Sequence, residues 1–386
     1  MIPYSRQNIS FGDVLSVVKA LKSSHLTQGP QVPRFEEAVC RYTGSKYGVA
    51  VNSATSALHI ACLALGIGPG DSVWTTSISF VASANCAIFC GAKVDFVDID
   101  KDSWNLSLEH LKNKLEAARG SGALPKALVV VHLGGLPAQM VEIRALSKQY
   151  GFHVVEDASQ ALGARIGEER VGGCQWSDIA VFSFHAVKNI TTGEGGIAVT
   201  NNRSLAMKMS LIRSHGITRN PADYQRADAS SAPWYYEQVD LGFNYRLTDF
   251  QAALGFSQIV KIEKFNLVRR RILAYYTREL ESFEGIALQS IDPTFTTSAH
   301  LAIVRFKNGL LRDKVAYALR AKGYGTALHY PPIHKQPFYE RLMVRQLAEA
   351  ENYAEQALSL PCHPRLRLRQ AKEVVKIIRD TVLDNI

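Results

Sequence analysis

From residue 47 to residue 157 the chain alternates short apolar runs with longer amphipathic stretches. The apolar runs predict strands at residues 47–51, 71–76, 94–100, 127–132 and 152–157. Helical patterns lie between them. Strands that alternate with helices form a mostly parallel sheet covered on both faces, because each crossover carries a helix that packs on the sheet. The sequence therefore predicts an α/β fold.

The rest of the chain predicts further helices and a second, smaller unit. Helical patterns precede the sheet at 9–23 and 32–42, and a polar loop spans 218–237. A long helix is expected from 249 to about 282, with Thr248 as its N-cap. Beyond it we expect a strand at 301–306, a helix at 311–322, a strand at 325–330 and terminal helices. This pattern predicts a large domain over residues 1–250, whose N-terminal segment can pack on the smaller domain, and a small α+β domain over 251–386.

Four side chains lie at or just beyond the carboxyl ends of predicted strands: Thr55, Phe80, Asp157 and Lys188. In open α/β sheets, ligands bind outside these ends. We therefore expect the four side chains to converge on one site.

Lys188 lies in a polar, Gly-rich connection between two apolar runs that begin at Ile179 and Ile197. A lysine held between buried strands would have a lowered pKa and a nucleophilic amine, as a Schiff-base lysine requires. The alternative is a solvated lysine on a hairpin loop, which is how most lysines occur.

Residues 52–58 follow the first strand directly and open a helix. Free backbone N–H groups, the helix dipole and the hydroxyls of Thr55 and Ser56 would form an anion site there. Ordinary helix capping is the alternative, and the Gly-Lys-Ser/Thr of a Walker A loop is missing. Asp157 likewise could cap the next helix or pair with a protonated heterocyclic nitrogen.

The charge and cysteine content of the chain indicate which ligands and which cellular location to expect. The formal net charge of +9 favours anionic ligands, and since the basic residues are spread rather than clustered, phosphorylated small molecules are favoured over nucleic acid. The six cysteines form no C-x-x-C pair, which predicts free thiols in a reducing compartment and no metal site. No signal peptide or membrane-spanning run is recognisable, so the predicted location is the cytoplasm, without membrane association.

Six motifs in order resemble one family. They are residues 52–58, Phe80 within Ser79–Asn85, residues 156–161, Phe182 to Lys188, residues 192–196 and Gly242 to Arg246. Together they resemble the sugar aminotransferases of the DegT/DnrJ/EryC1/StrS family, which are fold-type I enzymes that use pyridoxal 5'-phosphate (PLP). The likeness runs from about Ile2 to the C-terminal helices.

The resemblance implies roles for individual residues. Lys188 matches the Schiff-base lysine and proton shuttle, and Asp157 matches the partner of the pyridine nitrogen. Phe80 matches the ring-stacking position, and Gln160 a residue near the ring and its 3-hydroxyl. The matching phosphate contacts are Thr55, Ser56, Ser183 and Asn244. Asn244 would come from the neighbouring subunit, so the site would need a homodimer.

The resemblance also implies the reaction. L-Glutamate would donate its amino group to the cofactor, and the 4-keto carbon of a nucleotide-linked 6-deoxy sugar would accept it. Motifs such as residues 26–30, 191–196 and 213–219 resemble the transaminases of pseudaminic acid biosynthesis. Leu136, where relatives commonly carry a polar residue, departs from the pattern and bears on sugar specificity. The candidate substrate contacts are Thr27, His185, Glu194, His329 and Tyr330.

Three alternatives compete with this reading. A PLP-dependent sugar dehydratase of the same fold would carry histidine in place of Lys188. A catalytically inactive binding protein would lack Asp157, Lys188 or Asn244, and all three are present. The strongest alternative keeps the enzyme class and changes the sugar, to a perosamine, viosamine or 3-amino sugar type.

Overall fold

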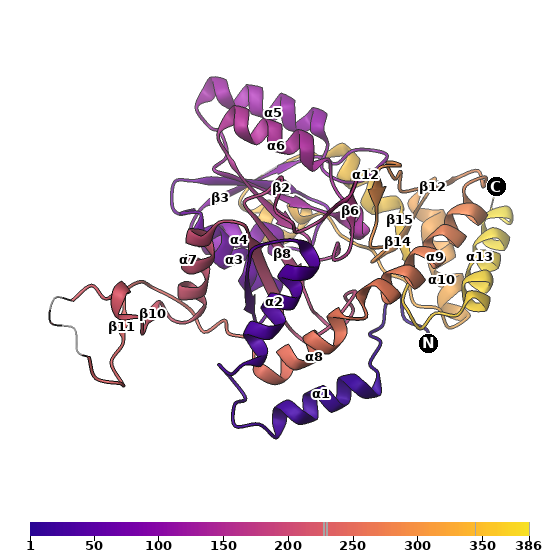
Figure 1. The fold of residues 1–386 in the computed structure, drawn as a ribbon. Helices are drawn as coiled ribbons and strands as arrows, with labels where there is room; N and C mark the ends of the chain where they lie inside the picture. The colour runs from indigo at the N-terminus through magenta and orange to yellow at the C-terminus, as the bar shows by residue number, and fades with distance from the viewer. Residues whose placement is uncertain (227, 229–230, 344, 386) are drawn as a thin grey trace.

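The computed structural model of the chain describes residues 1–226, 228, 231–343 and 345–385, so residues 227, 229 and 230 of the predicted polar loop lie outside it. Figure 1 shows the described elements. The α-helices are α1 Phe11–Leu21, α2 Gln31–Thr43, α3 Ala54–Ala64, α4 Ala82–Phe89, α5 Leu108–Ser121, α6 Met140–Tyr150, α7 Arg203–Arg213, α8 Asp249–Ile259, α9 Ile262–Leu280, α10 Gly309–Ala321, α11 Pro337–Glu340, α12 Ala348–Gln356 and α13 Leu368–Leu383. The strands are β1 Tyr47–Val51, β2 Ser72–Thr76, β3 Lys93–Val97, β4 Ala127–Val131, β5 His153–Asp157, β6 Arg165–Ile166, β7 Glu169–Arg170, β8 Ile179–Ser183, β9 Gly196–Thr200, β10 Ile217–Thr218, β11 Glu237–Gln238, β12 Ile286–Leu288, β13 Phe295–Thr296, β14 Ala302–Phe306 and β15 Ala357–Leu360.

A seven-stranded sheet forms the centre of the molecule, in the order β1-β9-β8-β5-β4-β2-β3. The pairs β2–β3, β2–β4, β4–β5 and β5–β8 are parallel, whereas β9 runs antiparallel to β8 and β1. The predicted mostly parallel α/β sheet is confirmed. Four of the five strands in these parallel pairs, β2, β3, β4 and β5, were expected from the alternating sequence pattern, and the fifth, β8, is the apolar run that begins at Ile179.

Helices cover both faces of this sheet, as the continuous apolar strands require. In β4, Val129 packs with residues of α3 and α4 on one face. Its neighbours Leu128 and Val130 pack with residues of α5 and α6 on the other face. Because successive side chains of a strand point to opposite faces, a run such as Ala127–Val131 is apolar throughout.

The antiparallel strand β9 begins at the edge where the parallel strands end. Its first residue, Gly196, lies so close to the start of α3 that a Cβ atom there would sit 2.5 Å from the backbone nitrogen of Ala54 and 2.5 Å from the carbonyl carbon of Ser53. Only glycine permits this approach of two backbones. Gly196 therefore fixes the position of the α3 N-terminus relative to the sheet.

We expect Gly196→Ala to lower the free energy of unfolding by about 1–3 kcal/mol or more, because the contacted atoms are backbone and cannot rotate away. Urea denaturation followed by circular dichroism would measure this. Gly68→Ala is the matched control, since a Cβ there meets open space. Equal stability of the two variants would contradict the close packing of β9 on α3.

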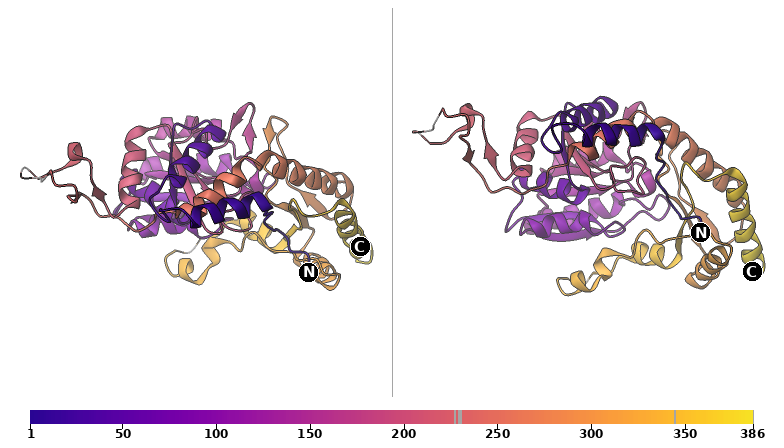
Figure 2. Two further views of the ribbon diagram at one scale, coloured as in Figure 1. Left: turned by 60° about the horizontal axis from the view of Figure 1, so that its bottom comes forward. Right: turned by 90° about the horizontal axis from the view of Figure 1, so that it is seen from below.

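A second, antiparallel sheet has the order β12-β14-β15. Helices α9, α10 and α13 bury it in a separate apolar cluster, at the right of Figure 1. At the opposite side, the pair β10–β11 belongs to an arm that projects from the body of the molecule in both views of Figure 2.

The single long helix predicted from residue 249 to about 282 is wrong: α8 ends at Ile259 and α9 begins at Ile262. The predicted N-cap Thr248 is confirmed. At the break, the Lys261 ammonium lies 2.5 Å from a carboxylate oxygen of the buried Asp13 in α1. Lys261 and Asp13 are 248 residues apart in the sequence. No proline or glycine lies at the break to indicate it in the sequence.

The strand predicted at 325–330 is also wrong. Only Tyr324 and Ala327 form isolated bridges there, with Ile2 and Ser359. Beyond Ala327 the chain reaches the central sheet, where Ile333 N donates to the carbonyl oxygen of Ser77 just after β2. A fully buried strand, β15, instead lies within the segment where only terminal helices were predicted, and it pairs with β14.

The six cysteines are all free and buried, as predicted. Within the described residues, none of the helices combines the length and apolar character that crossing a membrane would need.

Candidate active site

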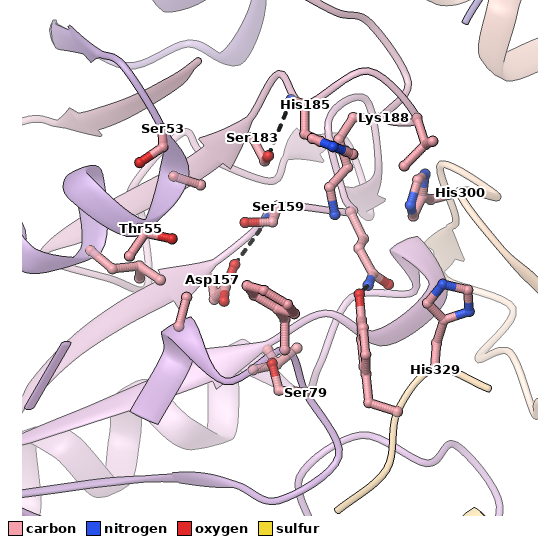
Figure 3. A pocket seen from close by; sticks show the side chains of 18 of the residues that line it. Ser53, Thr55, Ser79, Asp157, Ser159, Ser183, His185, Lys188, His300 and His329 are labelled. Carbon is pink, nitrogen blue, oxygen red and sulfur yellow. Dashed lines mark hydrogen bonds between the residues drawn. The ribbon is translucent and has the colours of Figure 1, made fainter. Parts of the chain in front are cut away.

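A cavity of about 440 Å³ opens at the carboxyl-terminal edge of the central sheet (Figure 3). Loops that follow β1, β2, β5 and β8 supply its walls, as expected for a parallel sheet. Ten of the predicted site residues line it: Thr55, Phe80, Asp157, Gln160, Ser183, His185, Lys188, Glu194, His329 and Tyr330. The expected convergence of Thr55, Phe80, Asp157 and Lys188 is therefore observed.

Three predicted site residues do not line this cavity. Ser56 is buried in the first turn of α3, where its hydroxyl donates to Asn52 Oδ1 at 2.7 Å. Thr27 is exposed and forms a bridge with Thr248. Asn244 lies in the loop before α8 and forms a bridge with Ser214.

Lys188 extends its amine into the cavity (Figure 3). Desolvation by burial lowers the pKa of this amine to about 8, and the Asp157 carboxylate acts in the opposite direction. At pH 7 an amine with a pKa of about 8 is roughly 10% neutral, some 300-fold more than an ordinary lysine. The site therefore holds a nucleophilic amine at neutral pH.

Asp157 ends β5 and is buried. The Ser83 hydroxyl donates to its Oδ2 at 2.6 Å, and the backbone N–H of Ser159 donates to its Oδ1 at 3.2 Å. Each carboxylate oxygen thus accepts one hydrogen bond, which fixes the orientation of the group. Asp157 does not cap a regular helix, because the segment that follows it is a turn.

The start of α3 forms one wall of the cavity. Ser53 is the N-cap and its hydroxyl accepts from Ser56 N at 3.1 Å. Ser53, Ala54 and Thr55 all line the cavity. The free N–H groups and the dipole of the helix favour an anion at this point. Figure 3 shows Ser53, Thr55 and Ser183 on the same side of the cavity.

Two aromatic side chains form another part of the wall. Phe80 is 57% exposed although it lies within the cavity, so its ring is free to contact a bound molecule. The Tyr330 ring lies 6.3 Å from it. Gln160 donates from Nε2 to the Tyr330 hydroxyl at 2.7 Å and accepts at Oε1 from Gly134 N at 2.7 Å.

Three histidines lie around Lys188. Burial lowers the pKa of His329 to about 4, helped by the charge of Lys188, and its Nδ1 lies 2.8 Å from Ser359 Oγ. Burial also lowers the pKa of His300 well below its ordinary value. Both rings are therefore neutral at pH 7. His185 is more exposed, and its Nε2 lies 3.9 Å from a carboxylate oxygen of Glu194.

Sequence reasoning missed several residues that line the cavity, among them Tyr4, Ser53, Ser79, Ser159 and His300. Ser53, Ser79 and Ser159 lie inside motifs that were recognised, so their position next to Thr55, Phe80 and Asp157 could have identified them. Tyr4 lies at the start of the family likeness, which begins at about Ile2, whereas no local pattern marks His300.

Comparison with known proteins decides the family. The model of the DegT/DnrJ/EryC1/StrS aminotransferase family matches residues 10–379. The chain belongs to this family. It is 37% identical to UDP-4-amino-4,6-dideoxy-N-acetyl-beta-L-altrosamine transaminase of Campylobacter jejuni (serotype O:23/36) over 385 residues, which cover 99% of this chain and 96% of the relative.

Solved structures of similar proteins have the same fold. Helicobacter pylori PseC, an aminotransferase involved in the biosynthesis of pseudoaminic acid, superimposes with a TM-score of 0.91 at 29% identity, over 99% of both chains. DesV of S. venezuelae, solved in complex with a ketimine intermediate, gives a TM-score of 0.84 at 32% identity, over 95% of this chain and 93% of that one. The chain is a fold-type I, nucleotide-sugar aminotransferase.

The cofactor of such an enzyme is PLP, and the cavity fits it. The cavity offers a nucleophilic amine on Lys188, a buried carboxylate on Asp157 and an exposed ring face on Phe80. The N-terminus of α3 is a place where the phosphate can bind. Because Gly196 has no Cβ atom, the backbone of Ser53 and Ala54 at this helix start can pack directly on β9. These groups suit an aromatic aldehyde that carries a phosphate and a ring nitrogen.

The lowered pKa of Lys188 predicts how the apoenzyme takes up PLP. Only the neutral amine attacks an aldehyde, so the association rate should rise with pH through a midpoint near 8. In Asp157→Asn the midpoint should move down, because the carboxylate charge holds the proton on the amine. Stopped-flow mixing of apoenzyme with PLP across pH would measure it. A midpoint near 10 in the wild type, typical of an exposed lysine, would contradict the assigned environment.

Proposed function

We propose that the enzyme transfers an amino group from L-glutamate to the 4-keto carbon of a nucleotide-linked 6-deoxy sugar. The acceptor we propose is UDP-2-acetamido-2,6-dideoxy-β-L-arabino-hex-4-ulose of pseudaminic acid biosynthesis. The observation that carries the proposal is the cavity itself, which brings Lys188, Asp157 and the α3 N-terminus together. The names of the Campylobacter and Helicobacter relatives support the choice of sugar.

In this proposal PLP supplies an electron sink when it is bound. The Lys188 amine would hold the cofactor and would take up and release a proton at Nζ, because its neutral form is a base at neutral pH. The Asp157 carboxylate holds a proton on the pyridine nitrogen. Thr55, Ser183 and the first N–H groups of α3 would hold the phosphate, and the Phe80 ring would contact the cofactor ring.

The sugar would enter on the side of His185, Glu194, His329 and Tyr330. The neutral His329 ring can exchange hydrogen bonds with sugar hydroxyls without repelling the Lys188 amine. The Tyr330 hydroxyl accepts from Gln160, so its own hydrogen can be donated into the cavity. The net charge of +9 suits a nucleotide diphosphate.

An assay against UDP-, dTDP- and GDP-linked 4-keto and 3-keto sugars tests this proposal. The expected result is an amino sugar from the UDP-linked 4-keto substrate, with one 2-oxoglutarate formed for each amine transferred. Preference for a GDP- or dTDP-linked sugar would replace the acceptor by a perosamine, viosamine or 3-amino sugar type. Loss of a sugar hydroxyl without amine transfer would identify a dehydratase instead.

We also propose a homodimer with shared active sites. Two surfaces support it. Helix α1 presents an apolar stripe whose exposed fractions run from 39% to 76%, made of Phe11, Val14, Leu15, Val18 and Leu21. The projecting arm carries Trp234, which is 77% exposed. Apolar stripes of this kind are typical of surfaces covered in an assembly. Asn244, predicted as a phosphate contact, lies outside the cavity of its own chain and could serve that of a second copy.

Mixing two inactive variants tests the shared site. Lys188→Ala and Asn244→Ala should each be inactive or nearly so as homodimers. After joint refolding, about half of the dimers contain one chain of each variant. One site of such a dimer carries both substitutions and the other carries neither. About a quarter of the wild-type activity should therefore return. No recovery from mixed dimers would contradict the contribution of Asn244 from the neighbouring subunit.

We propose, finally, that residues 1–250 form the PLP-binding domain and residues 251–386 the smaller one. The apolar cluster around β14 and helices α9, α10 and α13 supports a second core, while Tyr339 and Tyr353 pack into the core of the large sheet.

The six free thiols support the cytoplasm as the location.

A further inference from the structure

Two buried serine hydroxyls connect the cavity wall to Asp157. Ser83 lies in the first turn of α4 and is fully buried, and its Oγ is 2.6 Å from Asp157 Oδ2. Ser79 lines the cavity, and its Oγ is 2.6 Å from Ser83 Oγ. Neither residue was predicted as part of the site, although both flank Phe80 in the same motif.

The chemistry of the groups fixes the direction of this chain. An ionised carboxylate only accepts hydrogen bonds, so the single hydroxyl hydrogen of Ser83 points to Asp157. Ser83 Oγ must then accept the hydrogen of Ser79. Both hydroxyls are therefore aligned toward Asp157 Oδ2, and each hydrogen bond strengthens the next.

We propose that Ser83 is a positioning residue that keeps Asp157 ionised and aimed at the pyridine nitrogen of PLP. A hydrogen bond to the ionised form of a carboxyl group stabilises that form. A carboxylate held in this way would pair with the ring nitrogen when PLP is bound. The inference rests on the proposed role of Asp157 and extends it by naming the group that controls this carboxylate.

The alternative donor to Asp157 is weak. The backbone N–H of Ser159 reaches Oδ1 at 3.2 Å, which is at the long end of the normal range. Without Ser83, Oδ2 would be buried with no donor among the contacts that the described residues make. A buried carboxylate with an unsatisfied oxygen binds a proton more readily or turns toward another donor. Either change weakens its hold on a protonated ring nitrogen.

The test uses holoenzyme loaded with ¹⁵N-pyridine-labelled PLP. In the wild type, the ¹⁵N chemical shift should be that of a protonated pyridine nitrogen. In Ser83→Ala it should move toward the unprotonated position, the PLP dissociation constant should rise about tenfold or more, and kcat should fall about 10- to 100-fold. Ser83→Thr, which keeps the hydroxyl, should return most of the wild-type shift and affinity.

Two further variants complete the experiment. Ser79→Ala removes only the outer hydroxyl and should change the ¹⁵N shift in the same direction by less, and it keeps the test available where Ser83→Ala fails to fold. Ser147→Ala, which removes a buried serine hydroxyl from α6, is the matched control and should leave the ¹⁵N shift unchanged.

The outcomes separate this inference from the role of Asp157. A folded Ser83→Ala variant with wild-type ¹⁵N shift and PLP affinity would overturn the role of Ser83, provided that Asp157→Asn changes both. If Asp157→Asn also leaves both unchanged, the proposed role of Asp157 fails and the inference falls with it. A shift that moves in Ser83→Ala and returns in Ser83→Thr supports both.

Discussion

Replacing Lys188 by alanine is expected to abolish amine transfer, with a loss of roughly 10⁴-fold or more in kcat, because one side chain both holds PLP and moves the proton. Lys188→Arg should be equally inactive. Its guanidinium keeps the positive charge but cannot attack an aldehyde or act as a base at neutral pH. Steady-state assays with L-glutamate and a keto sugar would measure both losses.

The control for this prediction is Lys208→Ala, which removes an exposed lysine from α7. It should retain full activity and full PLP content. Thermal unfolding should show that Lys188→Ala remains folded. The substitution removes a half-buried charged group, and with it the free-energy cost of desolvating that charge. Substantial turnover by either Lys188 variant would contradict the proposed mechanism, regardless of how much PLP the variant contains.

The second large effect is expected from Asp157→Asn. The amide keeps the size of the side chain and can still accept from Ser83, but it carries no charge to hold a proton on the ring nitrogen. Removing one preorganised electrostatic contact from an active site typically costs about 10²- to 10³-fold in kcat. Single-turnover reaction of PLP-loaded enzyme with L-glutamate would isolate this effect from sugar binding.

Asp102→Asn is a suitable control, since this carboxylate is exposed and lies away from the cavity. Its half-reaction rate should equal that of the wild type. A rate in Asp157→Asn within about threefold of the wild type would contradict the assigned partnership between Asp157 and the cofactor ring. Addition of PLP to saturation excludes simple cofactor loss as the cause.

Much of the fold follows from local sequence because its strands are buried on both faces. Runs such as Ala127–Val131 are apolar throughout, and the helical patterns between them predict the crossovers. The carboxyl-end rule then places Asp157 and Lys188 in one cavity without any knowledge of side-chain contacts. Local pattern and topology together were enough to predict that these side chains meet in one cavity.

Features fixed by distant contacts could not be predicted in this way. The break between α8 and α9 coincides with the contact from Lys261 to Asp13, which lies near the other end of the chain. His300 reaches the cavity from the segment before β14, where its Nδ1 lies 3.0 Å from Asn189 Oδ1. A single histidine between two strands gives no sign of such a partner. Asn244 carries a prediction that only an assembly of two chains can test.

The most direct test of the central claim is the absorption spectrum of the purified, PLP-loaded enzyme before and after L-glutamate is added. The account predicts a visible band from the cofactor held by Lys188, which L-glutamate replaces with a near-ultraviolet band as 2-oxoglutarate appears. A visible band that L-glutamate leaves unchanged would contradict the proposed amino donor. If no visible band forms in the folded protein with excess PLP, the assignment of Lys188 is wrong.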